Sequence, residues 1–136
     1  MLVPEIWVAF AEESGIPELK KTTRDEPDYD KLMNFRLGIL KEHGLGLKEI
    51  QETIATIDPI PGAKEFLDEL RSMTQVIIIS DTFSQFAGPL MKKLGYPTIF
   101  CNELVVAEDG EITGFKMRCE QSKLTTVKAP VSYTHL

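Results

Sequence analysis

The sequence predicts an α/β protein built on an open parallel sheet, and three observations support this prediction. Residues 75–79 form a continuous apolar run, which is typical of a strand covered on both faces of a parallel sheet. A helical segment at 84–94 separates this run from a second short strand at 98–100, which is the order of a βαβ unit. The Glu-Asp-Gly stretch at 108–110 lies between two further strand-like segments and predicts a hairpin.

The first half of the chain is predicted to be helical. A helix is expected over 3–14, with Pro4 in its first turn and Gly15 at its end. Two more helices are expected over 28–43 and 47–57. Their pattern indicates a small helical insert rather than another layer of the sheet.

The second half is predicted to supply the sheet and a helix that covers it. A helix over 63–72 is expected to point Phe66, Leu67 and Leu70 inward. The remaining strands, those of the hairpin, are expected at residues 104–107 and 112–117.

Composition narrows the class of protein. The 136 residues suffice for one domain, or for a small core domain with an insert. A net charge of −6 argues against nucleic acid or an acidic membrane surface as a partner, because both need a cationic surface. Cys101 and Cys119 are expected to be reduced structural thiols. No signal-peptide pattern is present, and no apolar run approaches the roughly 18 residues of a membrane helix, so the chain is expected to be cytoplasmic.

The apolar run at 75–79 leads directly into Ser80, Asp81 and Thr82. In open α/β sheets, ligands bind at the carboxyl ends of the strands. A serine hydroxyl and the backbone N–H groups that follow can hold a phosphate there, with Asp81 capping the next turn or helix. The alternative is that these residues only form a capping turn.

Arg36 lies on the apolar stripe of the helix predicted over 28–43. A guanidinium in that position either snorkels outward or meets an anion such as a carboxylate. Taken alone, Glu5 and Lys123 fit solvated surface residues, and Met33 fits the core.

Five stretches of the chain resemble the haloacid dehalogenase superfamily, and within it the phosphoserine phosphatase branch. The resemblance covers residues 2–128 with almost no gaps and is strongest to bacterial members that also transfer the phosphoryl group to homoserine. The stretches read PEIWVAFAEESGI, TTRDEPDYDKLMNFRLGIL, IDPIPGAKEFLDELR, VIIISDTFSQFAGPLMKKLGYPTIFCNEL and GFKMR.

The resemblance implies a Rossmann-like core with a helical cap inserted after its first strand. Residues 1–15 would then hold the first core helix, 16–58 the cap, and 59–129 part of the core. Residues 130–136 are expected to be a non-native tail, because Pro130 would break the helix that the family continues there.

The resemblance also implies roles for the candidate residues. Ser80 matches the serine whose hydroxyl and adjacent amide hold the transferring phosphoryl group, and Asp81 follows it as in this branch. Lys123 falls in register with the lysine that neutralises the phosphoryl group and the nucleophile.

The resemblance also implies a site that binds the amino-acid part of a substrate. Glu5 matches the acid that binds the ammonium group, and Arg36 matches the arginine that binds the carboxylate. Met33 is expected to line the pocket beside Arg36.

The reaction that the resemblance implies is a two-step phosphoryl transfer from phosphoserine through an aspartyl-phosphate, assisted by Mg²⁺. The family's nucleophile and acid/base aspartates and its remaining Mg²⁺ ligands are expected outside these 136 residues. The chain is therefore expected to be an incomplete, inactive piece whose strand at 75–79 has an unpaired edge. The alternatives are a phosphatase for another small phosphomonoester and a non-catalytic binding remnant. No oligomeric state is predicted.

Overall fold

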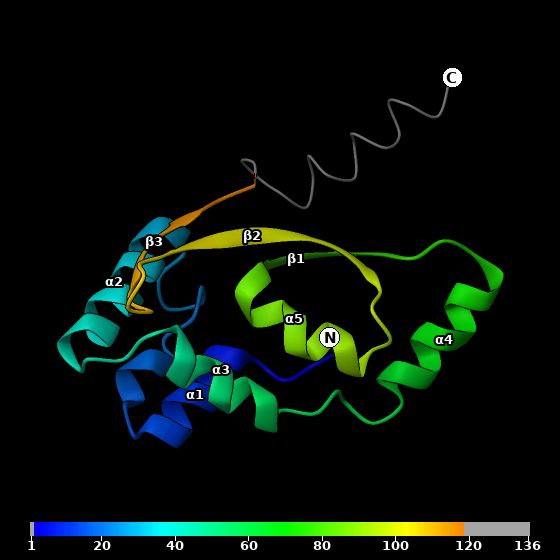
Figure 1. Ribbon diagram of the computed structural model, residues 1–136, viewed down its shortest axis with the longest axis horizontal. Coiled ribbons are helices and arrows are strands. Elements are labelled where there is room, and N and C mark those ends of the chain that lie inside the picture. The colour runs from blue at the N-terminus through cyan, green and yellow to red at the C-terminus, as the bar shows by residue number, and fades with distance from the viewer. Residues whose placement is uncertain (1, 119–136) are drawn as a thin grey trace.

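A computed structural model describes residues 2–118 and shows a twisted sheet with helices packed mainly on one side (Figure 1). The described strands are β1 (Ile77–Phe83), β2 (Thr98–Val106) and β3 (Ile112–Lys116), in the spatial order β1-β2-β3. β1 pairs with β2 in parallel, and β2 pairs with β3 in antiparallel, so the predicted βαβ unit and hairpin are both confirmed. The predicted tail at 130–136 lies outside the described residues.

The helices follow the predicted order with small changes at their ends. They are α1 (Ile6–Ser14), the short 3₁₀ turn η1 (Pro17–Lys20), α2 (Tyr29–Glu42), α3 (Leu47–Thr56), α4 (Ala63–Met73) and α5 (Ser84–Lys93). None of the described helices is both long and apolar enough to cross a membrane.

α1 begins later than the sequence predicted. It starts at Ile6, and the residue before it, Glu5, has an extended backbone, so Pro4 precedes the helix instead of occupying its first turn. The end of the helix was predicted correctly. Gly15 adopts a left-handed conformation with φ 72° and donates its backbone N–H to the carbonyl of Ala11, which closes the helix.

α2 is capped where the sequence indicates. The Asp28 carboxylate accepts hydrogen bonds from the backbone N–H groups of Asp30 and Lys31, at 3.1 and 3.3 Å. At α3 the Glu49 carboxylate accepts a bond of 2.8 Å from the N–H of Gly46, just before the helix. These local bonds satisfy N–H groups that a helix start leaves without partners.

The strand predicted at 75–79 differs from the observed β1. β1 starts at Ile77 and continues through Phe83, so Ser80 and Asp81 lie inside the strand rather than after it. The expectation of burial on both faces was also wrong, since Ile77 is 48% exposed. Two features explain this: among the described strands β1 pairs only with β2 and forms an edge of the sheet, and the described helices pack mainly on one side of the sheet.

The two short strands predicted at 98–100 and 104–107 are one strand, β2. Its first part pairs with β1 and its last part with β3, so the central residues join two ladders. Cross-strand partners hold the polar stretch between the two apolar segments in extended conformation, and a local pattern does not reveal such partners.

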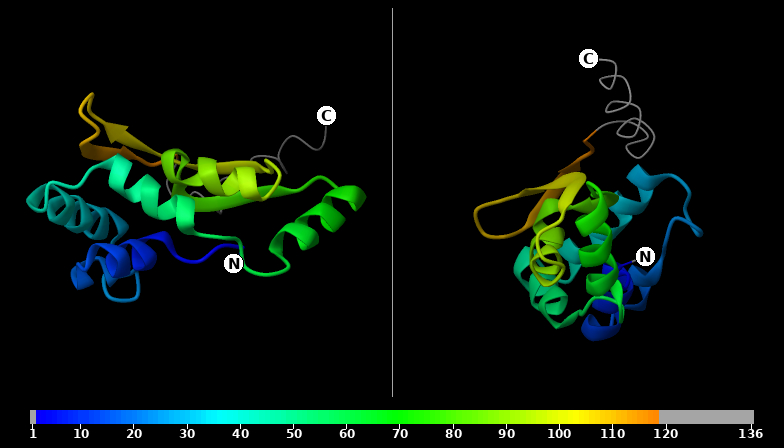
Figure 2. Two further views of the ribbon diagram at one scale, coloured as in Figure 1. Left: turned by 60° about the horizontal axis from the view of Figure 1, so that its bottom comes forward. Right: turned by 90° about the vertical axis from the view of Figure 1, so that its right-hand side faces the viewer.

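The main hydrophobic core joins the first helices to the sheet. Trp7 packs edge-on against Phe86 with ring centroids 5.7 Å apart, and Phe83 packs similarly on Phe86 at 5.7 Å. Ile50 and Ile54 of α3 belong to the same cluster and are fully buried. The helices of segment 16–58 therefore share one core with α1 and α5, as the arrangement in Figure 2 indicates.

α4 stands apart from this core at one end of the molecule (Figure 1). It packs through a smaller cluster that contains Ala63, Leu67 and Leu94. The prediction that Phe66 faces inward was wrong, because its side chain is 59% exposed. Phe66 lies next to Leu67 in sequence and so about 100° around the helix from it, which turns it away from the small cluster.

Candidate functional site

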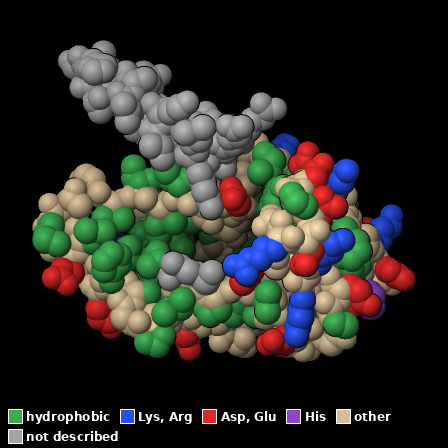
Figure 3. All heavy atoms as spheres, turned by 180° about the vertical axis from the view of Figure 1, so that it is seen from behind, with side chains coloured by type: hydrophobic (Ala, Val, Ile, Leu, Met, Phe, Trp, Pro, Cys, Tyr) green, Lys and Arg blue, Asp and Glu red, His purple; other side chains and the backbone are tan. Residues whose placement is uncertain are grey.

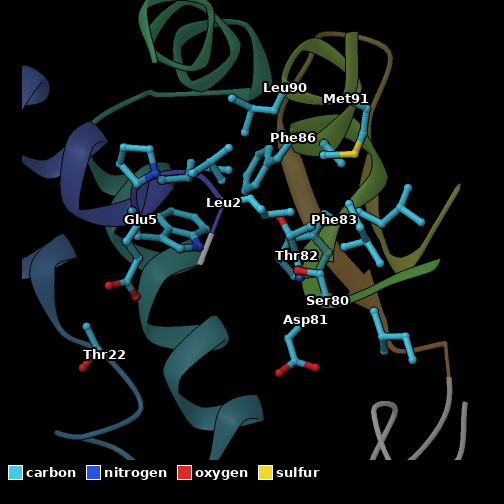
Figure 4. A pocket seen from close by; sticks show the side chains of 18 of the residues that line it. Leu2, Glu5, Thr22, Ser80, Asp81, Thr82, Phe83, Phe86, Leu90 and Met91 are labelled. Atoms are coloured by element: carbon cyan, nitrogen blue, oxygen red, sulfur yellow. Dashed lines mark hydrogen bonds between the residues drawn. The ribbon is translucent and has the colours of Figure 1, made fainter. Parts of the chain in front are cut away.

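A cavity of about 760 Å³ opens between the N-terminal segment, α2, β1 and α5. Its walls include apolar residues of β1 and α5, and polar side chains gather along one part of it (Figure 4). Figure 3 shows hydrophobic side chains around a hollow on one face of the molecule. Four of the predicted site residues line this cavity, namely Glu5, Arg36, Ser80 and Asp81.

β1 bends where the phosphate-binding residues were predicted. Ile79 pairs with Phe100, but the next pair joins Phe83 to Asn102, so β1 contains extra residues at 80–82. Within this bulge the Ser80 hydroxyl accepts a bond of 3.2 Å from the N–H of Thr82. Residues 80–82 of this tight turn all line the cavity.

The expectation that Asp81 caps the following helix was wrong. α5 begins after Phe83, and no side chain forms a capping hydrogen bond at its start. The Ser80 hydroxyl accepts the N–H of Thr82 within this turn. The bulge keeps Asp81 within the strand, too far back along the chain to cap α5, and its side chain reaches the cavity wall.

The backbone carbonyl of Asp81 is held by two side chains that the sequence analysis missed. The Tyr29 hydroxyl donates to it at 3.1 Å, and the Asn102 side-chain amide donates to it at 3.1 Å. Asn102 is only 2% exposed, and its oxygen accepts a bond of 2.9 Å from the N–H of Arg118. A polar residue in the middle of β2 was the only signal in the sequence, whereas Tyr29 looked like an ordinary apolar-stripe residue.

Arg36 is buried with its guanidinium in the cavity wall. It is 4% exposed, so the alternative that it snorkels outward was wrong. The guanidinium lies over the Trp7 ring at 4.7 Å, and its Nη2 donates to the Lys21 carbonyl at 2.9 Å. Its Nε is buried without a hydrogen-bond partner in the described structure. The guanidinium therefore keeps hydrogen-bonding capacity for an anion.

Burial lowers the pKa of Arg36, because desolvation disfavours the charged form, while Tyr29 and Glu5 act in the opposite direction. Glu5 precedes α1 and is exposed, and it lines the same cavity (Figure 4). A cationic group and an anionic group thus face one space. This pairing suits a zwitterion, whose carboxylate and ammonium have the complementary charges.

Of the two remaining predicted site residues, Met33 lies behind the cavity wall and Lys123 is not described. Met33 is fully buried, and its sulfur lies 3.7 Å from Nη1 of Arg36, so it supports the guanidinium and is not itself among the residues that line the cavity. Lys123 lies outside the described residues.

Sequence comparison finds phosphoserine phosphatases. The chain is 54% identical over 129 residues to phosphoserine phosphatase ThrH of Pseudomonas aeruginosa, a match that covers 95% of this chain and 63% of the relative. It is 51% identical over 129 residues to a phosphoserine phosphatase of Pseudomonas syringae pv. tomato, covering 54% of that protein. The chain thus spans little more than half of the length of these relatives. No protein-family model matches it.

Solved structures with the same fold include two phosphoserine phosphatases. A substrate-bound phosphoserine phosphatase complex aligns with a TM-score of 0.78 at 24% identity, over 100% of this chain and 68% of the other. A phospho-aspartyl intermediate analogue of phosphoserine phosphatase aligns with a TM-score of 0.77 at 23% identity, over 99% and 68%. At these identities the likeness establishes the shared α/β fold.

Proposed function

We propose that this chain belongs with the phosphoserine phosphatases of the haloacid dehalogenase superfamily, to which its sequence is similar, and that it forms the substrate-selecting part of such an enzyme. The reaction is the hydrolysis of O-phospho-L-serine to serine and phosphate. The observation that carries the proposal is that Arg36, Glu5 and Ser80 line one cavity. Their chemistry matches the carboxylate, ammonium and phosphoryl groups of phosphoserine.

In the proposed complex the phosphoryl group lies at the β1 bulge. The Ser80 hydroxyl accepts the N–H of Thr82 and can donate its own proton to a phosphoryl oxygen. Lys123 is proposed to neutralise the phosphoryl charge. Asp81 shapes the bulge and limits the space beside the phosphoryl group.

The amino-acid end is proposed to lie against α1 and α2. Arg36 binds the carboxylate through its unpaired Nε and its Nη atoms, and Met33 holds the guanidinium from the protein side. Glu5 binds the ammonium group. In this arrangement residues 16–58 act as a cap that selects the substrate and residues 59–129 belong to the catalytic core.

The chemical step needs groups that this chain is not proposed to supply. An aspartate carboxylate attacks phosphorus, the bond to the serine oxygen breaks, and that oxygen receives a proton; water then cleaves the aspartyl-phosphate. We propose that this nucleophile and its acid/base partner lie in the remainder of a longer protein. The 136-residue chain alone is therefore expected to release no phosphate from phosphoserine.

The cofactor proposed for the whole enzyme is Mg²⁺. Residues 2–118 contain no group of three His, Cys, Asp or Glu side chains that could hold a metal ion, so this part of the chain does not fit a magnesium site by itself. We propose that the ligands come from outside the described residues.

Transfer of the phosphoryl group to homoserine is proposed as a second activity. Homoserine has the same ammonium and carboxylate as serine and only one more methylene group. Glu5 and Arg36 can therefore bind it in the same way, and a cavity of about 760 Å³ accommodates the extra length. Formation of phosphohomoserine from phosphoserine and homoserine by the full-length protein tests this proposal.

The test of substrate selection is an Arg36→Met variant of this chain, titrated with phosphoserine by isothermal calorimetry. Loss of charge-assisted hydrogen bonds to a carboxylate is expected to weaken binding about 10- to 100-fold. Arg71→Met is the matched control, because Arg71 is exposed and does not line the cavity. Equal affinities of wild type and Arg36→Met would reject the proposed substrate.

A further inference from the structure

The Asp81 carbonyl connects the helical segment to the sheet. It accepts one hydrogen bond from Tyr29 on α2 and one from Asn102 on β2, each 3.1 Å long. Asn102 is buried and is itself held by the N–H of Arg118. The carbonyl therefore has a fixed place in the sheet, and the Tyr29 hydroxyl attaches α2 to that fixed point.

Tyr29 and Arg36 occupy the same face of α2. They are seven residues apart, which is about two turns or about 10 Å along the helix. Tyr29 contacts the bulge beside Ser80, and both Tyr29 and Arg36 line the same cavity. The bond from Tyr29 to Asp81 thus fixes how far the guanidinium lies from the Ser80 hydroxyl.

The Tyr29 ring also has a packing contact that does not involve its hydroxyl. It packs edge-on against Phe115 of β3 with ring centroids 6.4 Å apart. Removing only the hydroxyl is therefore expected to leave α2 packed on the hairpin, while releasing its attachment to the bulge.

We propose that Tyr29 is a positioning residue that sets the spacing between the phosphoryl site at Ser80 and the carboxylate site at Arg36. This inference rests on the proposed function, since it concerns a substrate held at both ends. A ligand bound at both ends requires the correct spacing, and each mismatch costs affinity. A ligand bound at one end only does not detect the spacing.

The test compares three ligands on the 136-residue chain: phosphoserine, inorganic phosphate and L-serine. In Tyr29→Phe, calorimetry is expected to show phosphoserine binding weakened about 3- to 10-fold, the range for loss of one neutral hydrogen bond. Phosphate and L-serine, which each occupy one end, are expected to change by less than about 2-fold. Tyr96→Phe is the matched control, because Tyr96 is 69% exposed and does not line the cavity.

The outcomes separate this inference from the proposed function. If wild type binds phosphoserine and Tyr29→Phe binds it equally well, the spacing role is rejected while the proposed function stands. A similar loss for all three ligands indicates general damage and also rejects the spacing role. If wild type binds neither phosphoserine nor phosphate, the proposed function fails and the inference fails with it.

A measurement without ligand completes the test. The carbonyl ¹³C resonance of Asp81 is expected to shift in Tyr29→Phe, because that carbonyl loses one of its two side-chain donors. The same resonance is expected to stay in place in Tyr96→Phe. An unchanged Asp81 resonance in Tyr29→Phe would show that the bond is absent in solution and would overturn the inference.

Discussion

The Tyr29 side chain at the cavity makes a hydrogen bond that depends on its protonation state. Burial raises the pKa of Tyr29 to about 12, with Arg36 opposing this shift and Asp81 and Asp30 adding to it. The hydroxyl therefore keeps its proton at neutral pH and can donate to the Asp81 carbonyl. An ionised tyrosine could not form this bond.

The raised pKa predicts a specific dependence of stability on pH. The neutral phenol is favoured in the folded protein, so its contribution is complete below the unfolded pKa of 10.0 and is lost as the pH rises toward about 12. Over this interval the unfolding free energy of wild type is expected to fall by about 1–2 kcal/mol more than that of Tyr29→Phe. Denaturant titrations at several pH values measure both slopes. Parallel slopes would contradict the prediction.

The sequence identified part of the cavity and missed the groups that support it. Arg36 drew attention because a charge on an apolar stripe is unusual, and Ser80 because it follows an apolar run. The roles proposed for them came from family resemblance, since spacing alone also fitted a snorkelling arginine and a capping turn. Tyr29 and Asn102 act through the backbone of Asp81, which is distant in sequence from both, so no local pattern could reveal them.

At the level of elements, the turn before α3 is fitted closely to the hairpin between β2 and β3. The backbone N–H of Leu47 donates to the Gly110 carbonyl at 2.9 Å. A Cβ atom on Gly46 would lie 2.6 Å from the same carbonyl oxygen, which is closer than such atoms can approach. Any residue with a Cβ atom would therefore clash with this carbonyl, so the position requires glycine.

Glycine-to-alanine substitutions at positions 46 and 38 are predicted to have opposite effects on the unfolding free energy. Gly46→Ala is expected to lower the unfolding free energy by about 1–3 kcal/mol, because the hairpin turn must move. Gly38→Ala is expected to raise it by about 0.5–1 kcal/mol, because Gly38 lies inside α2 with no atom within 4 Å of the added Cβ. Thermal and denaturant unfolding measure both. A Gly46→Ala variant as stable as wild type would show that the hairpin is not held at this turn.

Helix ends were predicted more accurately than strand ends, for a physical reason. Asp28 and Gly15 act on their own helices through neighbouring backbone groups, so the signal is local. β1 and β2 end where their partners end, and these partners are distant in sequence. The β1 bulge at 80–82 could not be foreseen because it arises from mismatched lengths of two paired strands.

For the molecule as a whole, the outer edge of β1 stands out, because no described strand pairs with it. Within residues 2–118 this strand pairs only with β2, and Ile77 on it is 48% exposed. Nearby, α4 exposes Phe66 and Met73, at 59% and 70%. Unpaired backbone groups beside apolar side chains can pair with another chain, so the isolated chain is expected to self-associate.

A charge on the edge strand is predicted to suppress this association. Ile77→Lys places a charged side chain on β1, where pairing with a second chain would bury it, and is expected to raise the soluble concentration at least about 3-fold. Met73→Lys makes the same charge change on α4, outside β1 itself, and is expected to have a smaller effect. Sedimentation velocity over a range of concentrations reports the association directly. Equal improvement in both variants would show that apolar surface in general, rather than the β1 edge, drives association. A strictly monomeric wild type would show that the edge is protected in solution.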